Sequence, residues 1–286
     1  MFWNQLKTVL LLSCLSGLFF LVGYGMGGSR GLVVAFMMAL LMNFVAYFFS
    51  DKIVLSMYGA QKLDTVQHAK IYDMVEELCH NADIPMPKLW YIPSSMANAF
   101  ATGRNPQHAS VAVTQGILDI LDEQELRGVI AHELGHVKNR DILIATVAAT
   151  IATAIGYLAH MMQWAFIFGN RDERERGGGW GALIAAIIMP IAAMFIQMAI
   201  SRSREYLADE SGAEFARDPL ALASALEKLT MENKSQHRQP ESTAQSASAS
   251  LFIVYPFSGK GLVTLFSTHP PVEKRIQRLR ELAKRY

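Results

Sequence analysis

The stretch GVIAHELGHVKNRD, residues 128–141, places two histidines four positions apart in a segment with helical spacing. Asp122, ahead of it, and Glu125, three residues later, form the pattern of an N-cap with a capping box. The apolar residues that follow at the helical period are Leu126, Val129, Ile130, Leu134 and Val137. We therefore predict a helix on which His132 and His136 project from one face, a single turn apart.

This arrangement is the H-E-x-x-H pattern of zinc enzymes. Two imidazoles one turn apart can bind one tetrahedral metal ion at about 2.0–2.1 Å each. Glu133 lies beside the same face, where its carboxylate can act as general base toward a water that zinc activates. A solvated polar helix face is the alternative for an isolated motif. The well-capped helix favours the metal, as does Gly135, which leaves room for a close neighbour.

A catalytic zinc site usually has three protein ligands and an open position, so a third ligand must come from elsewhere in the chain. The segment SRSREYLADESGAEF, residues 201–215, offers Glu205 and Asp209 four positions apart on a predicted helix. We expect Glu205 to bind the metal and Asp209 to accept the free ring N–H of a ligating histidine. The alternative is a solvated helix on which these carboxylates form surface ion pairs.

The composition indicates a membrane protein. The chain of 286 residues is 51% hydrophobic with a mean hydropathy of +0.20, which is more apolar than an ordinary soluble domain of this size. Four runs lack charged residues, at 8–28, 31–49, 142–168 and 180–200, and about 20 apolar residues suffice to span a bilayer. We predict four transmembrane helices in two hairpins, the first with a tight turn at 27–31. A net charge of +1 without a basic stripe argues against nucleic-acid binding.

The runs divide the chain into a first hairpin (1–50), a first catalytic part (51–141), a second hairpin (142–200) and a second catalytic part (201–286). An even number of spans between the two polar parts puts them on one side of the membrane. Four lysines flanking the first hairpin, Lys7, Lys52, Lys62 and Lys70, outnumber Arg30 in its turn, which indicates the cytoplasmic side. Three arginines in the loop at 169–179 favour the opposite orientation, so whether the second pair crosses fully is left open.

Local patterns predict the secondary structure of the polar parts. Asp64 with Gln67 indicates the start of a helix that ends near Asn81. Short β-rich segments at 88–92, 98–103 and 110–114 predict a small antiparallel sheet. The polar segment 232–250 predicts a mobile loop. Cys14 and Cys79 form no disulfide framework and are expected to be small buried side chains.

Four motifs in chain order, SMANAFATG (95–103), HELGH, EYLAD and STHPPVEKRIQRL (267–279), together with the apolar runs, resemble the HtpX family of bacterial membrane zinc proteases, relatives of the CAAX prenyl proteases. The resemblance covers nearly the whole chain. It implies a mainly α membrane protein whose zincin-like α+β catalytic domain, with a small β-sheet, is assembled from two chain segments. It further implies one zinc ion per chain, bound by His132, His136 and Glu205, with Glu133 as catalytic base.

The resemblance also implies a function. The expected protein is a quality-control endopeptidase of the bacterial inner membrane that cleaves misfolded or damaged membrane proteins under stress, with its active site facing the cytoplasm. Such enzymes are prone to self-cleavage, for which 232–250 is our expected site. The metal helix ends in polar residues directly before the third apolar run, so the metal would lie just outside the bilayer, level with the loops of membrane-protein substrates.

Three further residues have alternative interpretations. Asn98 can hydrogen-bond a substrate backbone along a sheet edge, or can be an ordinary turn asparagine. His269, before Pro270-Pro271, can donate a hydrogen bond to the developing oxyanion, or can simply precede the last helix. His160 stands alone in the third run, and we expect it to be neutral and packed.

Two rival functions remain. An intramembrane protease would carry the motif inside a span with a membrane-embedded aspartate, whereas here charged residues surround the motif and the last two runs contain no acid. A membrane scaffold with a structural metal would need a fourth protein ligand, and the sequence shows none.

Overall fold

The computed structural model describes residues 2–144, 147, 202–236, 251–254 and 270–285. Most of the third apolar run, the whole fourth run, His160, His269 and the segment 237–250 lie outside these residues. The predictions made for them therefore stay predictions.

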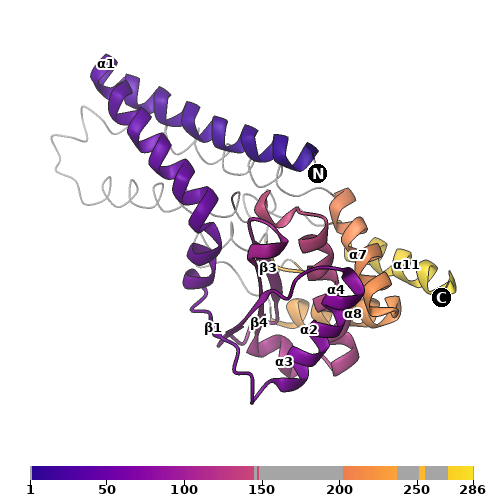
Figure 1. The fold of residues 1–286 in the computed structure, drawn as a ribbon. Coiled ribbons are helices and arrows are strands. Elements are labelled where there is room, and N and C mark those ends of the chain that lie inside the picture. The colour runs from indigo at the N-terminus through magenta and orange to yellow at the C-terminus, as the bar shows by residue number, and fades with distance from the viewer. Residues whose placement is uncertain (1, 145–146, 148–201, 237–250, 255–269, 286) are drawn as a thin grey trace.

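Helix α1 (Phe2–Met57) folds back on itself as the predicted hairpin. Gly28 has a φ of +55°, a left-handed conformation that glycine adopts without strain. The Asn43 Nδ2 donates a hydrogen bond to the Ser16 Oγ at 2.8 Å, although 27 residues of straight helix would separate them by about 40 Å. The two antiparallel arms are visible in Figure 1, so the predicted turn at 27–31 is confirmed.

The second arm of α1 contains Phe36–Met57, the one helix in the described part of the chain that is long and apolar enough to cross a membrane. Its last turns enter the domain below the hairpin, where Val54 and Leu55 are buried against Ile92 and Phe100. The second arm therefore connects the apolar hairpin to the sheet of the domain (Figure 1).

The sheet has four strands in the order β1-β2-β4-β3. Their bounds are β1 Gln61–Lys62, β2 Lys88–Ile92, β3 Ala99–Gly103 and β4 Ala109–Thr114. The three predicted strands are confirmed, but the wholly antiparallel pairing is wrong because β2 and β4 run parallel. The link from β2 to β3 begins Pro93-Ser94-Ser95 and lacks the short glycine or asparagine turn of a tight hairpin. Strand β3 therefore does not pair with β2. Strand β4 lies between β2 and β3 and pairs with β3 in the antiparallel direction.

Helices pack on the side of the sheet that faces the H-E-x-x-H motif. They are α2 (Ala69–Ala82), α3 (Gln115–Ile120), α4 (Glu123–Lys138), α7 (Arg202–Ala216), α8 (Pro219–Gln236) and α11 (Val272–Leu282), with 3-10 turns η1 (Pro106–His108) and η3 (Ala283–Arg285). The predicted start of α2 at Asp64 is wrong by five residues. The Asp64 carboxylate accepts the N–H groups of Val66 and Gln67, which caps a separate turn before the helix.

Helix α4 lies at the centre of the domain and packs against α2, α7, α8 and β3. A Cβ on Gly212 of α7 would lie 2.8 Å from the His132 nitrogen, and one on Gly135 would lie 3.0 Å from the Ala208 oxygen. These two glycines let α7 approach the motif face of α4 at backbone distance. One hydrophobic core thus unites residues from both polar parts of the chain.

Candidate metal centre

The capping box predicted at the start of α4 is present. The Asp122 carboxylate accepts the N–H groups of Gln124 and Glu125 at 3.0 Å, and the Glu125 carboxylate accepts the Asp122 N–H at 3.0 Å. Glu125 also binds Ser224 and Lys228 of α8 at 2.6 Å. The first turn of α4 is thereby held both locally and by a distant helix, which sets the rotation of the motif face.

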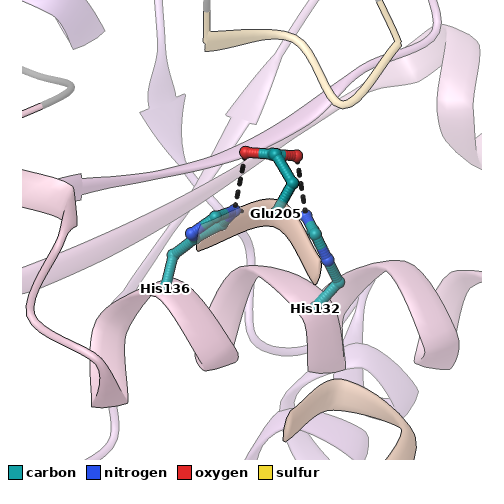
Figure 2. Close-up of side chains that lie close together, drawn as sticks. All are labelled: His132, His136 and Glu205. Atoms are coloured by element: carbon teal, nitrogen blue, oxygen red, sulfur yellow. Dashed lines mark hydrogen bonds and ion pairs between the residues drawn. The ribbon is translucent and has the colours of Figure 1, made fainter. Parts of the chain in front are cut away.

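His132 and His136 of α4 converge with Glu205 of α7, as Figure 2 shows. The two Nε2 atoms are 3.2 Å apart, and the Glu205 carboxylate oxygens lie 3.6 Å from the His136 Nε2 and 3.8 Å from the His132 Nε2. Ligand atoms of a tetrahedral zinc ion with bonds of 2.0–2.1 Å are separated by about 3.3 Å. The three side chains therefore fit one small metal ion with little adjustment, as the sequence predicted.

Two buried carboxylates orient the imidazoles. The His132 Nδ1 lies 3.0 Å from an Asp209 oxygen, and the His136 Nδ1 lies 3.1 Å from an Asp141 oxygen. A carboxylate at Nδ1 holds the proton there and leaves Nε2 as the metal-binding atom. The predicted contact of Asp209 with one of the two histidines is present, and in the described part of the chain no fourth side chain joins the group that could hold a metal ion.

Asp141 was missed by sequence reasoning, which assigned it to a polar border before the third apolar run. Arg140 has a φ of +57°, so the chain reverses after α4 and returns Asp141 to the His136 ring. Asp141 is only 4% exposed. An aspartate five residues after the second histidine was the available signal.

Arg275 of α11 was also missed. Its side chain has no exposed surface, and it donates to Asp209 at 2.7 and 2.9 Å and to the Ile253 carbonyl at 3.1 Å. Its guanidinium lies 3.5 Å from Glu205. An arginine is therefore the buried counter-charge of the carboxylates around the metal group. The signal was its position four residues before the buried Leu279, on the inner stripe of the last helix.

Glu133 lies beside the two histidines, and 5% of its surface is exposed. Its Oε2 accepts the N–H of Ala101 at 2.8 Å, from the edge strand β3. Burial raises the pKa of Glu133 above its ordinary value, although the neighbouring histidines and the Ala101 N–H oppose the shift. A raised pKa makes this carboxylate a stronger base.

The electrostatics of the group favour a bound cation. Burial would lower the pKa of His136, but contact with Asp141 and the nearby Glu205 and Glu133 raise it to about 10. Burial would raise the pKa of Asp209, but Arg275 and His132 lower it to about 2. Carboxylates therefore dominate the field at the His136 imidazole, which favours a bound divalent cation.

Asn98 serves the fold in this structure. It is 1% exposed, its side-chain oxygen accepts the Ile253 N–H at 3.1 Å, and its backbone pairs with Thr114. The substrate contact predicted for its side chain stays a prediction. The role predicted for His269 lies outside the described residues.

Comparison with known proteins gives a consistent result. The family model of peptidase family M48 matches residues 65–283. The chain is 52% identical over 283 residues to a protease HtpX homolog of Syntrophobacter fumaroxidans, covering 98% of this chain and 99% of that protein. It is 53% identical over 285 residues to a protease HtpX homolog of Thermodesulfovibrio yellowstonii, covering 99% and 100%. A crystal structure of S. mikatae Ste24p shares the fold, with a TM-score of 0.52 at 16% identity over 96% of this chain and 65% of that one. The chain therefore belongs to peptidase family M48 and is a metalloprotease.

Proposed function

We propose that this protein is a multi-pass zinc endopeptidase of the bacterial inner membrane that cleaves misfolded or damaged membrane proteins, with its active site at the cytoplasmic face. One observation supports the chemistry above all others. Two histidines of α4 and Glu205 of α7 bring three ligand atoms together beside the buried Glu133, in a domain whose sheet packs against the apolar hairpin.

The roles of the protein groups follow from their positions. When bound, zinc would polarise the scissile carbonyl and lower the pKa of the attacking water. Glu133 accepts the proton of that water and passes it to the leaving amine nitrogen. Asp209 and Asp141 keep both imidazoles turned toward the metal, and we propose His269 as a donor to the oxyanion.

The substrate backbone would lie along β3. Because the Asn98 backbone pairs with Thr114 of β4, the alternate residues Ala99, Ala101 and Gly103 direct their backbone groups away from the sheet. An extended peptide added at this edge would pass beside Glu133, which the Ala101 N–H already contacts. Unfolded chains present such segments, whereas folded domains do not, and this supports damaged proteins as substrates.

Membrane substrates are supported by the position of the motif. Helix α4 ends at Lys138, and the third apolar run begins at Ile142. Only three residues, at about 1.5–3.5 Å each, separate them, so the metal group stays close to the bilayer surface if that run is a span. Loops and ends of other membrane proteins lie at the same height.

The test is cleavage of an unfolded membrane-protein substrate by detergent-purified protein that is kept with chelator until zinc is added. We expect zinc-dependent cleavage by the wild type and none by Glu133→Gln, which should still bind one zinc per chain. Self-cleavage within 232–250 should yield two fragments from the wild type only. If Glu133→Gln cleaves as fast as the wild type, the assignment of the base is wrong.

The orientation needs a separate experiment. Gln61 of β1 is exposed, so a Gln61→Cys variant can be labelled with a membrane-impermeant maleimide. We expect labelling in inverted membrane vesicles and not in intact spheroplasts. The opposite pattern would place the active site outside the cytoplasm without affecting the peptidase proposal.

A further inference from the structure

A cleft of about 230 Å³ lies where the second arm of α1 meets the sheet, away from the metal group. Three cationic side chains line it: Lys52 of α1, Lys88 at the start of β2 and Arg104 after β3. Asp51 is the single carboxylate among the described residues that line it. The cleft therefore carries an excess of two positive charges while the whole chain has a net charge of +1.

These three cations are not paired in the part of the chain that the structure describes. Among the described residues, no carboxylate oxygen lies within 4.0 Å of the charged nitrogens of these three side chains. Elsewhere on the domain, basic side chains do find partners, as Arg127 does with Glu77 at 2.7 Å and Arg280 does with Glu227. Unpaired cations gathered in one cleft are suited to an anionic ligand.

Aromatic residues adjoin the cleft on its α1 side. Phe44, Tyr47, Phe48 and Phe49 are 53%, 37%, 42% and 39% exposed. The Arg104 guanidinium lies 5.4 Å from the centre of the Phe48 ring. Aromatic side chains with adjacent basic groups are typical of the level at which a helix leaves the hydrocarbon and enters the headgroup region.

The buried end of α1 shows where along the helix this headgroup level lies. Val54 is 1% exposed within the domain, about one turn after the last exposed aromatic residue. The change from an apolar exposed helix to a packed one thus occurs beside the cleft, so its cations lie at the height of lipid phosphates if α1 spans a bilayer.

We propose that this cleft binds the headgroup of an anionic phospholipid, with the phosphate held by Lys52, Lys88 and Arg104 and the acyl chains along the exposed aromatic face of α1. The bound lipid would fix the tilt of the catalytic domain on the membrane surface. This proposal needs α1 to lie in the bilayer, as the proposed function does, but it does not need peptidase activity.

The test measures binding of short-chain lipids to the full-length protein in neutral detergent by native mass spectrometry. The probes are dihexanoyl phosphatidylglycerol, dihexanoyl phosphatidylcholine and inorganic phosphate. The Lys52→Gln/Arg104→Gln double variant removes two charges from the cleft. Lys284→Gln/Arg285→Gln removes two from η3, which lies on the opposite side of the domain in Figure 1 and serves as the matched control.

We expect saturable binding of phosphatidylglycerol at one site and at least about tenfold weaker binding of phosphatidylcholine. Removing each basic charge should weaken binding about fivefold, hence about 25-fold for the cleft double variant and less than about twofold for the control. Asp51→Asn should tighten binding about fivefold, a gain that a folding defect does not produce. Glu133→Gln should bind the lipid like the wild type, whether or not cleavage is observed.

Three results would overturn the proposal. Equal weakening by both double variants would show a non-specific charge effect. Displacement of the lipid by inorganic phosphate at equal concentration would show a simple anion site. If the cleft double variant does not fold, an unchanged affinity of Asp51→Asn decides against the proposal.

Discussion

Replacing Arg275 with methionine would leave two buried carboxylates without the guanidinium that faces them. Arg275 has no exposed surface and makes two hydrogen bonds to Asp209, at 2.7 and 2.9 Å, and lies 3.5 Å from Glu205. Removing one partner of a buried ion pair costs about 3–5 kcal/mol because the remaining charge stays desolvated. For a domain of this size that loss corresponds to a fall in melting temperature of about 6–20 °C.

The assay is thermal unfolding followed by tryptophan fluorescence in detergent, with chelator present so that metal does not contribute to stability. Arg278→Met is the matched control, because Arg278 lies one turn further along α11 and pairs with Glu210 at the surface. A surface pair contributes about 0–1 kcal/mol, so the control should lower the melting temperature by less than about 4 °C.

The Arg275→Met/Asp209→Asn double variant tests the cause. Neutralising Asp209 removes the uncompensated charge, so the double variant should recover at least about half of the stability that Arg275→Met loses. A double variant as unstable as the sum of the two single variants would refute the explanation. So would an Arg275→Met variant that unfolds at the same temperature as Arg278→Met.

Three further outcomes follow from the structure. Asp141→Asn should weaken zinc binding about 10–100-fold, because His136 loses the carboxylate that orients its ring, and competition with a chelator of known affinity would measure this. Gly212→Val should lower stability by about 1–3 kcal/mol and reduce zinc occupancy, because its side chain would meet the His132 backbone; normal occupancy in a folded variant would contradict this. Burial raises the pKa of the Cys79 thiol to about 11, so at pH 8 it should react with a thiol reagent about 100-fold more slowly in the folded protein than after denaturation, and equal rates would show that it is accessible.

The predictions that depended on local sequence were the most accurate. The capping box at Asp122, the helical spacing and the one-turn separation of His132 and His136 are properties of a single helix, and all are present. The turn at Gly28 is equally local, since it follows from a residue that tolerates a positive φ between two apolar runs.

The predictions from sequence were wrong where one local pattern fits more than one structure. Asp64 was a valid capping residue, but the chain uses it for a turn because α2 begins only at Ala69. The strands were correctly located, whereas their order was not. Strand pairing depends on which edge the chain reaches after Pro93, and no short-range pattern encodes that choice.

The amino-acid sequence by itself determined the helix of the motif, its capping, the one-turn spacing of its two histidines with Glu133 beside them, and the apolar character of the hairpin, because each rests on residues within a few turns of one another. The four-residue spacing of Glu205 and Asp209 identified both, from the sequence alone, as candidate partners of the metal site. Only the tertiary structure decided that Asp141 returns to His136 and that Arg275, 143 residues after His132, supplies the buried positive charge. The contact of Asp141 follows from the backbone reversal at Arg140, whereas that of Arg275 depends on how α7 and α11 pack against α4, and packing is a property of the whole core that local patterns do not specify.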